Sequence, residues 1–293
     1  MILITGATGH FGNAVIDFLL KKIPAAEIAA LVRDEQKAAG LKEKGIAIRT
    51  GNYFDKTSLV KAFTGIDKLL LVSSNDFNDR FGQHRNVIDA AVEAGVKYVA
   101  YTGVSLKDVN TSVLKDAMQS HTDTDEYLRN SGLTYTLLNN SLYADIIPMF
   151  TGVNIAQTGI AVPAGNGKVP FATRSDMAEA AANVLTQPGH ENKQYPIGNG
   201  IAYSFADIAA TCATITGKPV NYTDLSHEAF LENLKNAGVP DGLAAFTAGF
   251  ALAIKNDEFN LPDDTLEKLL GRKPQSLEAY LRSRLFNEHN TGV

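Results

Sequence analysis

The sequence predicts an α/β fold in which a parallel sheet is covered by helices on both faces. Over the first 140 residues, short apolar runs rich in Ile, Val, Leu, Tyr and Thr alternate with amphipathic segments of helical period. Strands that are apolar throughout belong to sheets with both faces covered. We expect strands at residues 1–5, 27–32, 46–50, 68–73, 98–102 and 134–138.

The segments between these strands have helix signals at their ends. Asp55 is placed to cap a helix, and Gly65 to end it. Gly95 and Gly132 follow the next two helices in the same way. We expect helices at residues 12–22, 56–63, 81–94 and 124–130. This alternation predicts a doubly wound sheet.

The pattern loosens after residue 140. We expect an apolar loop at 142–154, strand-like pieces at 159–162 and 170–173, a helix at 175–186, a strand at 194–197 and a mostly helical tail from 204. No flexible linker is found. The sequence therefore predicts a first domain over 1–140, with sheet and helix additions from about 170–200, and a smaller, mostly helical lobe over 141–293.

Composition and charge narrow the class of protein. The chain has 293 residues, 45% hydrophobic and 20% charged, which is typical of a globular domain. A net charge of −5 without a basic stripe argues against nucleic-acid binding. No run approaches the roughly 18 apolar residues of a membrane helix, and no leader pattern opens the chain. Cys212, the single cysteine, is expected to be a buried thiol. We expect a cytoplasmic protein; its oligomeric state is left open.

A glycine-rich loop follows the first strand. Residues 6–12 are Gly6, Ala7, Thr8, Gly9, His10, Phe11 and Gly12. Glycines at this spacing permit a tight turn, close approach of backbone to a pyrophosphate, and close packing of helix on strand. The helix that starts here offers free N–H groups and the positive end of its dipole to phosphates. The spacing is one residue off the general fingerprint, but its place between strand and helix predicts a dinucleotide site.

The end of the second strand distinguishes the two nicotinamide dinucleotides. An acidic residue there bonds the ribose of NAD, whereas an arginine accommodates the 2′-phosphate of NADP. Here the strand ends in Arg33, and Lys37 follows on the next turns. A guanidinium grips a phosphate with two hydrogen bonds, and an ammonium adds charge. These residues predict NADP(H); the alternative is a solvated surface pair with Asp34 as a helix cap.

Two further strand ends are expected to line the same groove, because ligands of such sheets lie at the carboxyl ends of the strands. Asn52 and Tyr53 are placed to flank the adenine. Ser73 and Ser74 are placed to approach the ribose and the nicotinamide.

Several motifs together resemble a known family. The loop at 6–12, Leu31-Val32-Arg33, Tyr101-Thr102-Gly103, and residues 135–140 and 269–274 look like the NmrA-like, atypical short-chain dehydrogenase/reductase family. Within it, the resemblance is to the NADPH-dependent quinone oxidoreductases of type 2 and to triphenylmethane reductase. It covers essentially the whole chain and implies a Rossmann-type fold with a C-terminal substrate lobe.

The resemblance also implies site residues. Family members have a Leu-Arg-Asn-x-x-Tyr stretch beside the nicotinamide, which this chain matches at Asn140 and Tyr143. Asn139 replaces the arginine, so no anion contact is carried over there. His121 falls where the isoflavone-reductase branch has a catalytic lysine. Cofactor contacts are implied at Thr102, Leu138, Asn139, Asn140 and Ser141.

The usual catalytic dyad of the wider superfamily is absent. There, a lysine four residues after a tyrosine lowers the pKa of the phenol, which acts as general acid. No tyrosine of this chain has a lysine at that distance; Arg284, after Tyr280, is the one basic residue so placed, and it cannot exchange a proton near neutral pH. Reduction of an isolated ketone leaves an alkoxide and needs such a proton donor. Reduction of a quinone leaves a delocalised oxyanion, which is easier to protonate, and reduction of a carbocationic dye by hydride needs no proton. No Gly-x-Ser-x-Gly motif is found, which argues against a hydrolase. No cluster of His, Cys, Asp or Glu has the spacing of metal ligands, so no metal is expected.

Other candidate residues have two interpretations each. His84 is expected at the surface or at a helix cap. His121 is expected near the start of a helix, either facing the substrate or serving the helix start. The apolar loop at 142–150 either roofs a substrate pocket, with Tyr143 its best candidate, or forms core between the lobes. Surface positions are expected for His190, His227 and His289.

We therefore expect an NADPH-dependent reductase that passes hydride directly to a quinone or similar conjugated, aromatic acceptor in an apolar cleft between the lobes. The predicted catalytic residues are His121, Asn140 and Tyr143, acting mainly by positioning. The alternative is a non-catalytic protein that senses NADP(H), since the family includes a dinucleotide-binding regulator. A sugar-nucleotide epimerase shares the fold, but the missing dyad and Arg33 argue against it.

Overall fold

The structure, a computed structural model, describes residues 1–286, so that His289 lies outside the described residues. The chain divides into two compact units. Unit 1 consists of Met1–Val104, Asp116–Asn140 and Ser175–Pro196. Unit 2 consists of Ser105–Lys115, Ser141–Arg174 and the chain from Ile197 onward.

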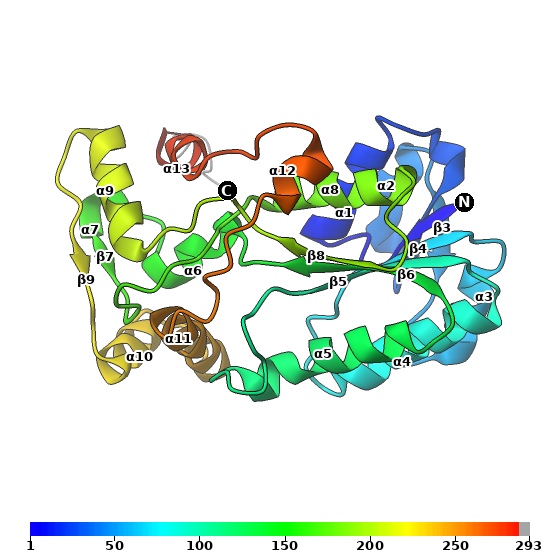
Figure 1. The fold of residues 1–293 in the computed structure, drawn as a ribbon, viewed down its shortest axis with the longest axis horizontal. Helices are drawn as coiled ribbons and strands as arrows, with labels where there is room; N and C mark the ends of the chain where they lie inside the picture. The colour runs from blue at the N-terminus through cyan, green and yellow to red at the C-terminus, as the bar shows by residue number, and fades with distance from the viewer. Residues whose placement is uncertain (287–293) are drawn as a thin grey trace. The chain divides into compact units, whose positions relative to one another are not determined.

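A seven-stranded sheet forms the centre of unit 1, in the order β3-β2-β1-β4-β5-β6-β8 (Figure 1). The pairings from β3 to β6 are parallel; Ile4, for example, aligns with Ala30 on one side and Leu70 on the other. The strands are β1 (Ile2–Ile4), β2 (Ile28–Val32), β3 (Ala47–Thr50), β4 (Lys68–Leu71), β5 (Tyr98–Val104), β6 (Thr134–Asn140) and β8 (Lys193–Ile197). The predicted Rossmann-type, doubly wound sheet is confirmed. Its order reverses between β1 and β4, and the carboxyl ends of strands at such a point bind ligands.

Helices cover both faces of this sheet. In Figure 1, α1 and α8 lie on one face, and α3, α4 and α5 on the other. On the second face, Tyr101 and Leu137 of the sheet pack with Phe63 of α3 and Val87 of α4. The helices are α1 (His10–Leu19), α2 (Ala39–Glu43), α3 (Lys56–Phe63), α4 (Arg80–Glu93), α5 (Lys115–Arg129) and α8 (Arg174–Thr186), with 3-10 turns at Ala25–Glu27 and Glu35–Ala38.

Three predicted elements differ from the structure. The apolar loop predicted at 142–154 contains a 3-10 turn at Ala144–Ile146 and the helix α6 (Ile147–Thr151). The helix predicted at 124–130 begins earlier, at Lys115, because its first half is polar and has no apolar period to detect. The strand predicted at 170–173 is wrong: the segment makes only an isolated bridge, between Ala172 and Tyr143. Pro170 has no amide to donate to a strand ladder.

Unit 2 is mostly helical, as predicted. Its helices are α6 (Ile147–Thr151), α7 (Ile155–Thr158), α9 (Phe205–Thr216), α10 (His227–Asn236), α11 (Asp241–Lys255), α12 (Thr265–Leu270) and α13 (Leu277–Phe286), with a 3-10 turn at Ala144–Ile146. The short strands β7 (Ile160–Ala161) and β9 (Tyr222–Thr223) pair in parallel. Among residues 1–286, no helix combines the length and the apolar character needed to cross a bilayer.

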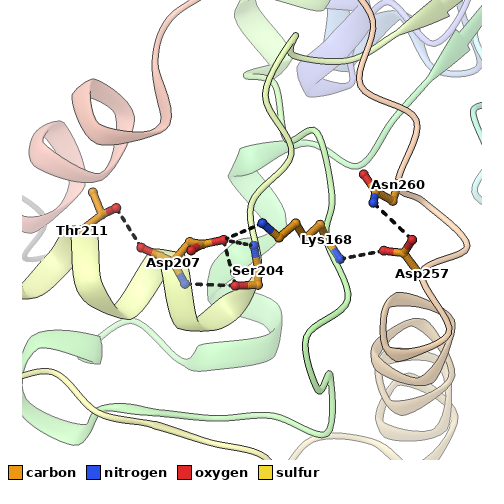
Figure 2. A network of polar contacts seen from close by, with 6 residues as sticks. All are labelled: Lys168, Ser204, Asp207, Thr211, Asp257 and Asn260. Atoms are coloured by element: carbon orange, nitrogen blue, oxygen red, sulfur yellow. Dashed lines mark hydrogen bonds and ion pairs between the residues drawn. The ribbon is translucent and has the colours of Figure 1, made fainter.

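Lys168 links two helices of unit 2 (Figure 2). At the start of α9, Ser204 and Asp207 form a capping box, in which each side chain accepts from the backbone amide of the other. The Lys168 ammonium lies 3.8 Å from the Asp207 carboxylate, and the Lys168 amide donates to Asp257, after α11, at 3.2 Å. Further along α9, Cys212 is buried as predicted, and burial raises the pKa of its thiol to about 11.

Gly167→Ala is expected to destabilise the protein by about 3 kcal/mol, since overpacking a tight contact typically costs this much. A Cβ on Gly167 would lie 1.7 Å from the Ile254 carbonyl oxygen, near the end of α11. The control is Gly242→Ala, at an exposed helical position with no atom within 4 Å of the added Cβ. That change is expected to stabilise by up to about 1 kcal/mol. Urea unfolding measures both, and equal midpoints for the two variants would contradict the close packing.

Candidate active site

The glycine loop joins β1 to α1 at the point where the strand order reverses. Gly6 has a φ of +57°, which side-chain-bearing residues rarely adopt. A Cβ on Gly12 would lie 2.4 Å from the Gly6 carbonyl oxygen, so the loop packs too closely on the helix for a side chain there. Gly9 is the N-cap of α1 and provides no side-chain cap, so backbone N–H groups at this helix start are available to an anion. Of the other loop residues, Ala7 and Phe11 are buried and Thr8 and His10 are exposed.

Arg33 follows β2 directly, and its side chain is exposed. Asp34 caps the next 3-10 turn by accepting from the Gln36 amide at 2.9 Å, and Lys37 lies exposed on this turn. The positive charge of Arg33 counteracts the rise in the pKa of Tyr53 that burial causes. Arg33 thus has exposed surface at the end of β2.

Tyr53 ties three strand ends together. Its hydroxyl donates to the Val72 carbonyl oxygen at 2.9 Å and lies 2.5 Å from the Thr5 hydroxyl. The Thr5 hydroxyl in turn accepts from the Val72 amide at 2.9 Å. The neighbouring Asn52 is exposed and accepts from the Phe54 amide at 3.1 Å. The Tyr53 hydroxyl thus serves the fold, and its ring is the part left for a ligand.

Hydroxyl groups also join the ends of β4 and β5. The Thr102 hydroxyl accepts from the Ser73 amide at 2.9 Å. Ser74 donates its hydroxyl to Gln83 at 2.9 Å and its amide to His84 Nε2 at 3.1 Å. The Ser73 hydroxyl is buried and has no hydrogen-bond partner among residues 1–286. Ser74 therefore holds the start of α4.

Two histidines lie deeper than the sequence predicted. His84 has no exposed surface, so the prediction of a surface or cap position is wrong. His121 lies in the second turn of α5 and is 9% exposed. Burial, and secondly the charge of Arg80, lowers the pKa of both histidines to about 3, so both rings are neutral at physiological pH. Two other predicted surface histidines, His190 and His227, are half-buried.

Tyr101 and Arg80 complete this cluster, and the sequence analysis assigned a role to neither. Tyr101 is fully buried in β5, with its hydroxyl 2.7 Å from His121 Nδ1. Arg80 donates from Nε to the Ser120 hydroxyl at 2.8 Å and bonds the Ala117 carbonyl oxygen. The Tyr-Thr-Gly motif pointed to Tyr101. Arg80 could have been found from its place in the first turn of a helix. The helix dipole disfavours a cation there, so an arginine at that position suggests a specific partner.

Asn139 and Asp125 face each other across Gly103 of β5. Asn139 pairs with Gly103 in the sheet, and a Cβ at 103 would lie 2.8 Å from Asn139 Oδ1 and 3.5 Å from Asp125 Oδ1. Both oxygens are buried without a hydrogen-bond partner in the described part of the chain. Burial raises the pKa of Asp125 to about 6. The other residues implied at the end of β6 are all buried: Leu138, Asn140 and Ser141.

Tyr143 lies in unit 2 and is half-exposed. The Arg174 guanidinium lies 4.9 Å from the centre of its ring and 3.5 Å from the Asp145 carboxylate. In the segment that follows, Phe150 of α6 is buried against Phe205, with ring centres 5.5 Å apart. Part of the apolar loop is therefore core of unit 2, and Tyr143 keeps surface that a ligand can reach.

The strand order, the glycine loop and the arginine after β2 define a dinucleotide-binding protein of the Rossmann class. The model of the NmrA-like family matches residues 1–281, and the chain belongs to this family. The resemblance seen in the motifs is thereby confirmed.

Relatives match over almost the whole chain. Quinone oxidoreductase 2 of Escherichia coli (strain K12) is 40% identical over 290 residues, covering 99% of this chain and 100% of that protein. NAD(P)H azoreductase of Xenophilus azovorans is 29% identical, with 97% of each chain covered. The solved structure of the E. coli NADPH-dependent quinone oxidoreductase complexed with NADPH has a TM-score of 0.91 at 40% identity, covering 98% of this chain and 100% of that one. Triphenylmethane reductase of Citrobacter sp., complexed with NADP(H), has a TM-score of 0.91 at 38% identity, with 97% and 100% covered. The prediction of an oxidoreductase is confirmed by these matches.

Proposed function

We propose that the protein is an NADPH-dependent reductase whose acceptor is a quinone or a similar conjugated aromatic compound. The observation that supports it most is the exposed Arg33 beside the glycine loop, in a chain similar over its whole length to a quinone oxidoreductase that binds NADPH. NADP(H) is the cofactor, and when bound it supplies the hydride. Direct transfer to the acceptor needs no second cofactor.

The residues that we assign to this cofactor lie in unit 1, apart from Ser141, where a segment of unit 2 begins. The amides at the start of α1, behind Gly6, Gly9 and Gly12, bind the pyrophosphate. Arg33, with Lys37, binds the 2′-phosphate. The remaining contacts run along the strand ends: Asn52 and Tyr53 at the adenine, Ser73, Ser74 and Thr102 toward the ribose, and Leu138, Asn139, Asn140 and Ser141 at the nicotinamide.

The acceptor side contributes orientation and hydrogen bonds. His121, Asn140 and Tyr143 are the residues we assign to it. The chain has no lysine four residues after any tyrosine, so it lacks the dyad that protonates the alkoxide in the wider superfamily. Reduction of a quinone leaves a delocalised oxyanion, which hydrogen bonds can stabilise without a general acid. This difference between the two products favours a quinone-like acceptor over an isolated ketone.

A screen of NADPH oxidation tests the function. Quinones and cationic triarylmethane dyes are expected to be reduced, and unconjugated ketones are expected to react very poorly. Efficient ketone reduction would contradict the proposed acceptor class. Tight NADPH binding without oxidation by any acceptor would favour a protein that senses NADP(H).

NADPH is expected to bind at least about tenfold more tightly than NADH, a difference of about 1.4 kcal/mol. Arg33→Ala should erase most of this preference and leave NADH binding nearly unchanged, because only NADPH carries the 2′-phosphate. Fluorescence titration of both dinucleotides measures it. Arg49→Ala, on the neighbouring strand β3, is the control and should keep the preference. Equal affinities of the parent for the two dinucleotides would show that Arg33 is only a surface residue.

A further inference from the structure

A chain of buried hydrogen bonds in unit 1 leads to His121. The Ser74 amide donates to His84 Nε2 at 3.1 Å, and His84 Nδ1 lies 2.9 Å from the Thr124 hydroxyl. The Tyr101 hydroxyl lies 3.5 Å from His84 Nδ1 and 2.7 Å from His121 Nδ1. The contacts join the end of β4, α4, β5 and α5, and His84 and Tyr101 have no exposed surface.

The backbone contact fixes the tautomer of His84. A backbone amide can only donate, so Nε2 of His84 accepts and carries no proton. The proton of the neutral ring is then on Nδ1, directed at the Thr124 hydroxyl oxygen. That hydroxyl donates its own hydrogen bond to the Ser120 carbonyl oxygen at 2.6 Å, so its oxygen can accept from His84.

This tautomer decides the direction of the Tyr101 hydrogen bond. His84 Nδ1 bears a proton and cannot accept from the Tyr101 hydroxyl. Of the two imidazole nitrogens near the phenol, only His121 Nδ1 can therefore accept a hydrogen bond from it, and it is also the closer of the two. His121 is left with its proton on Nε2, an atom with no hydrogen bond to any residue of the described chain.

The charged groups around His121 favour the neutral ring. Arg80, from the start of α4, donates to Ser120 and Ala117 in the turn of α5 before it, and its charge opposes a second one on the imidazole. The neighbouring His84 ring also lowers the pKa of His121. A neutral imidazole can donate a hydrogen bond without giving up its proton.

We propose that Tyr101 and His84 are positioning residues, which hold His121 in the tautomer whose Nε2–H donates a hydrogen bond to the carbonyl oxygen of the acceptor. The proposal rests on the proposed function for the identity of the acceptor. His121 is at the edge where β4 and β5 end, since its partner Tyr101 precedes Thr102, which bonds the Ser73 amide.

The reaction balances without an acid on the protein. NADPH gives up a hydride, with two electrons, and becomes NADP⁺. The quinone takes it and becomes a hydroquinone anion, whose oxygen accepts the bond from His121 Nε2–H. Water then supplies the proton that completes the hydroquinone. A cationic dye takes the hydride at carbon and becomes neutral, so it forms no oxyanion and gains nothing from this donor.

The test compares Tyr101→Phe with Tyr98→Phe. Tyr98 is a second buried tyrosine of β5, and its hydroxyl bonds Thr136 at 2.5 Å, so both variants lose a buried hydroxyl from the same strand. Tyr101→Phe is expected to lower kcat for a quinone about tenfold or more, a part of what an oxyanion donor contributes. It should leave kcat for a cationic triarylmethane dye unchanged, and Tyr98→Phe should change neither.

The tautomer has its own readout, in ¹H–¹⁵N spectra of the histidine side chains, assigned with His121→Gln and His84→Gln. The parent is expected to show His121 protonated at Nε2 only and His84 at Nδ1 only, with neither ring titrating between pH 5 and 8, as a pKa of about 3 requires. His121 protonated at Nδ1, a His121 titration near neutral pH, or equal slowing of quinone and dye by Tyr101→Phe would each overturn the proposal. If the parent protein fails to oxidise NADPH with every acceptor tested, the proposed function is overturned. The donor role of His121 is then overturned with it, whatever the spectra show.

Discussion

Gly9→Val is expected to weaken NADPH binding by at least about 100-fold, or about 2.7 kcal/mol, in a protein that still folds. Gly9 is exposed, and a Cβ there would meet only the Gly6 carbonyl oxygen, at 3.2 Å. The fold therefore accommodates a side chain at position 9. The branched side chain, however, occupies the space where the pyrophosphate approaches the start of α1.

The loop offers a control that separates binding from folding. At Gly12 a Cβ would lie 2.4 Å from the Gly6 carbonyl oxygen, so Gly12→Ala is expected to destabilise the fold itself. Titration with NADPH and with NADH, together with urea unfolding, distinguishes the two variants. Both dinucleotides should lose affinity for Gly9→Val, because both contain the pyrophosphate. Unchanged NADPH affinity in a folded Gly9→Val protein would mean that the loop is only a turn.

The features that the sequence predicted well are those set by neighbours along the chain. The strand, the three glycines and the start of α1 lie within residues 2–12, and the place of the glycines between a strand and a helix predicts a phosphate-binding turn. Arg33 is recognisable because it directly follows an apolar run. The doubly wound parallel sheet followed from the alternation of strands and helices, which restricts how a parallel sheet is connected.

The buried polar cluster could not be predicted, because its contacts are between residues far apart in the sequence. The partners of His84 are Ser74 and Thr124, 10 and 40 residues away. The apolar residues three, four and seven positions after His84 indicate that its side of α4 is buried, but nothing in the sequence identifies the polar groups that it meets there. The start of α5 was missed for a related reason. Its first turns are polar and are held by Arg80 from another helix.

Asp125 gives the second large expected effect, a stability change that depends on pH. Its folded pKa, about 6, lies above the ordinary value of 3.8, because burial disfavours the charged carboxylate. The ionised group therefore destabilises the folded protein at neutral pH. The penalty is complete above the folded pKa, shrinks as pH falls through 6, and vanishes below about 3.8, where the folded and unfolded chains are both protonated. A difference of about two pKa units corresponds to about 3 kcal/mol.

Asp125→Asn is accordingly expected to raise the free energy of unfolding by about 3 kcal/mol at pH 7.5 and by much less near pH 4. The new amide also brings N–H donors to Asn139 Oδ1, which has no partner among the described residues. Asp123→Asn, on the same helix, is the matched control: its half-exposed carboxylate accepts from Gln119 at 2.8 Å, and its removal should change stability by less than about 0.5 kcal/mol at either pH. Urea unfolding at the two pH values measures the effect. A gain for Asp125→Asn that is the same at both, or a loss at pH 7.5, would show that the buried carboxylate is stabilised in its charged form by contacts with its surroundings.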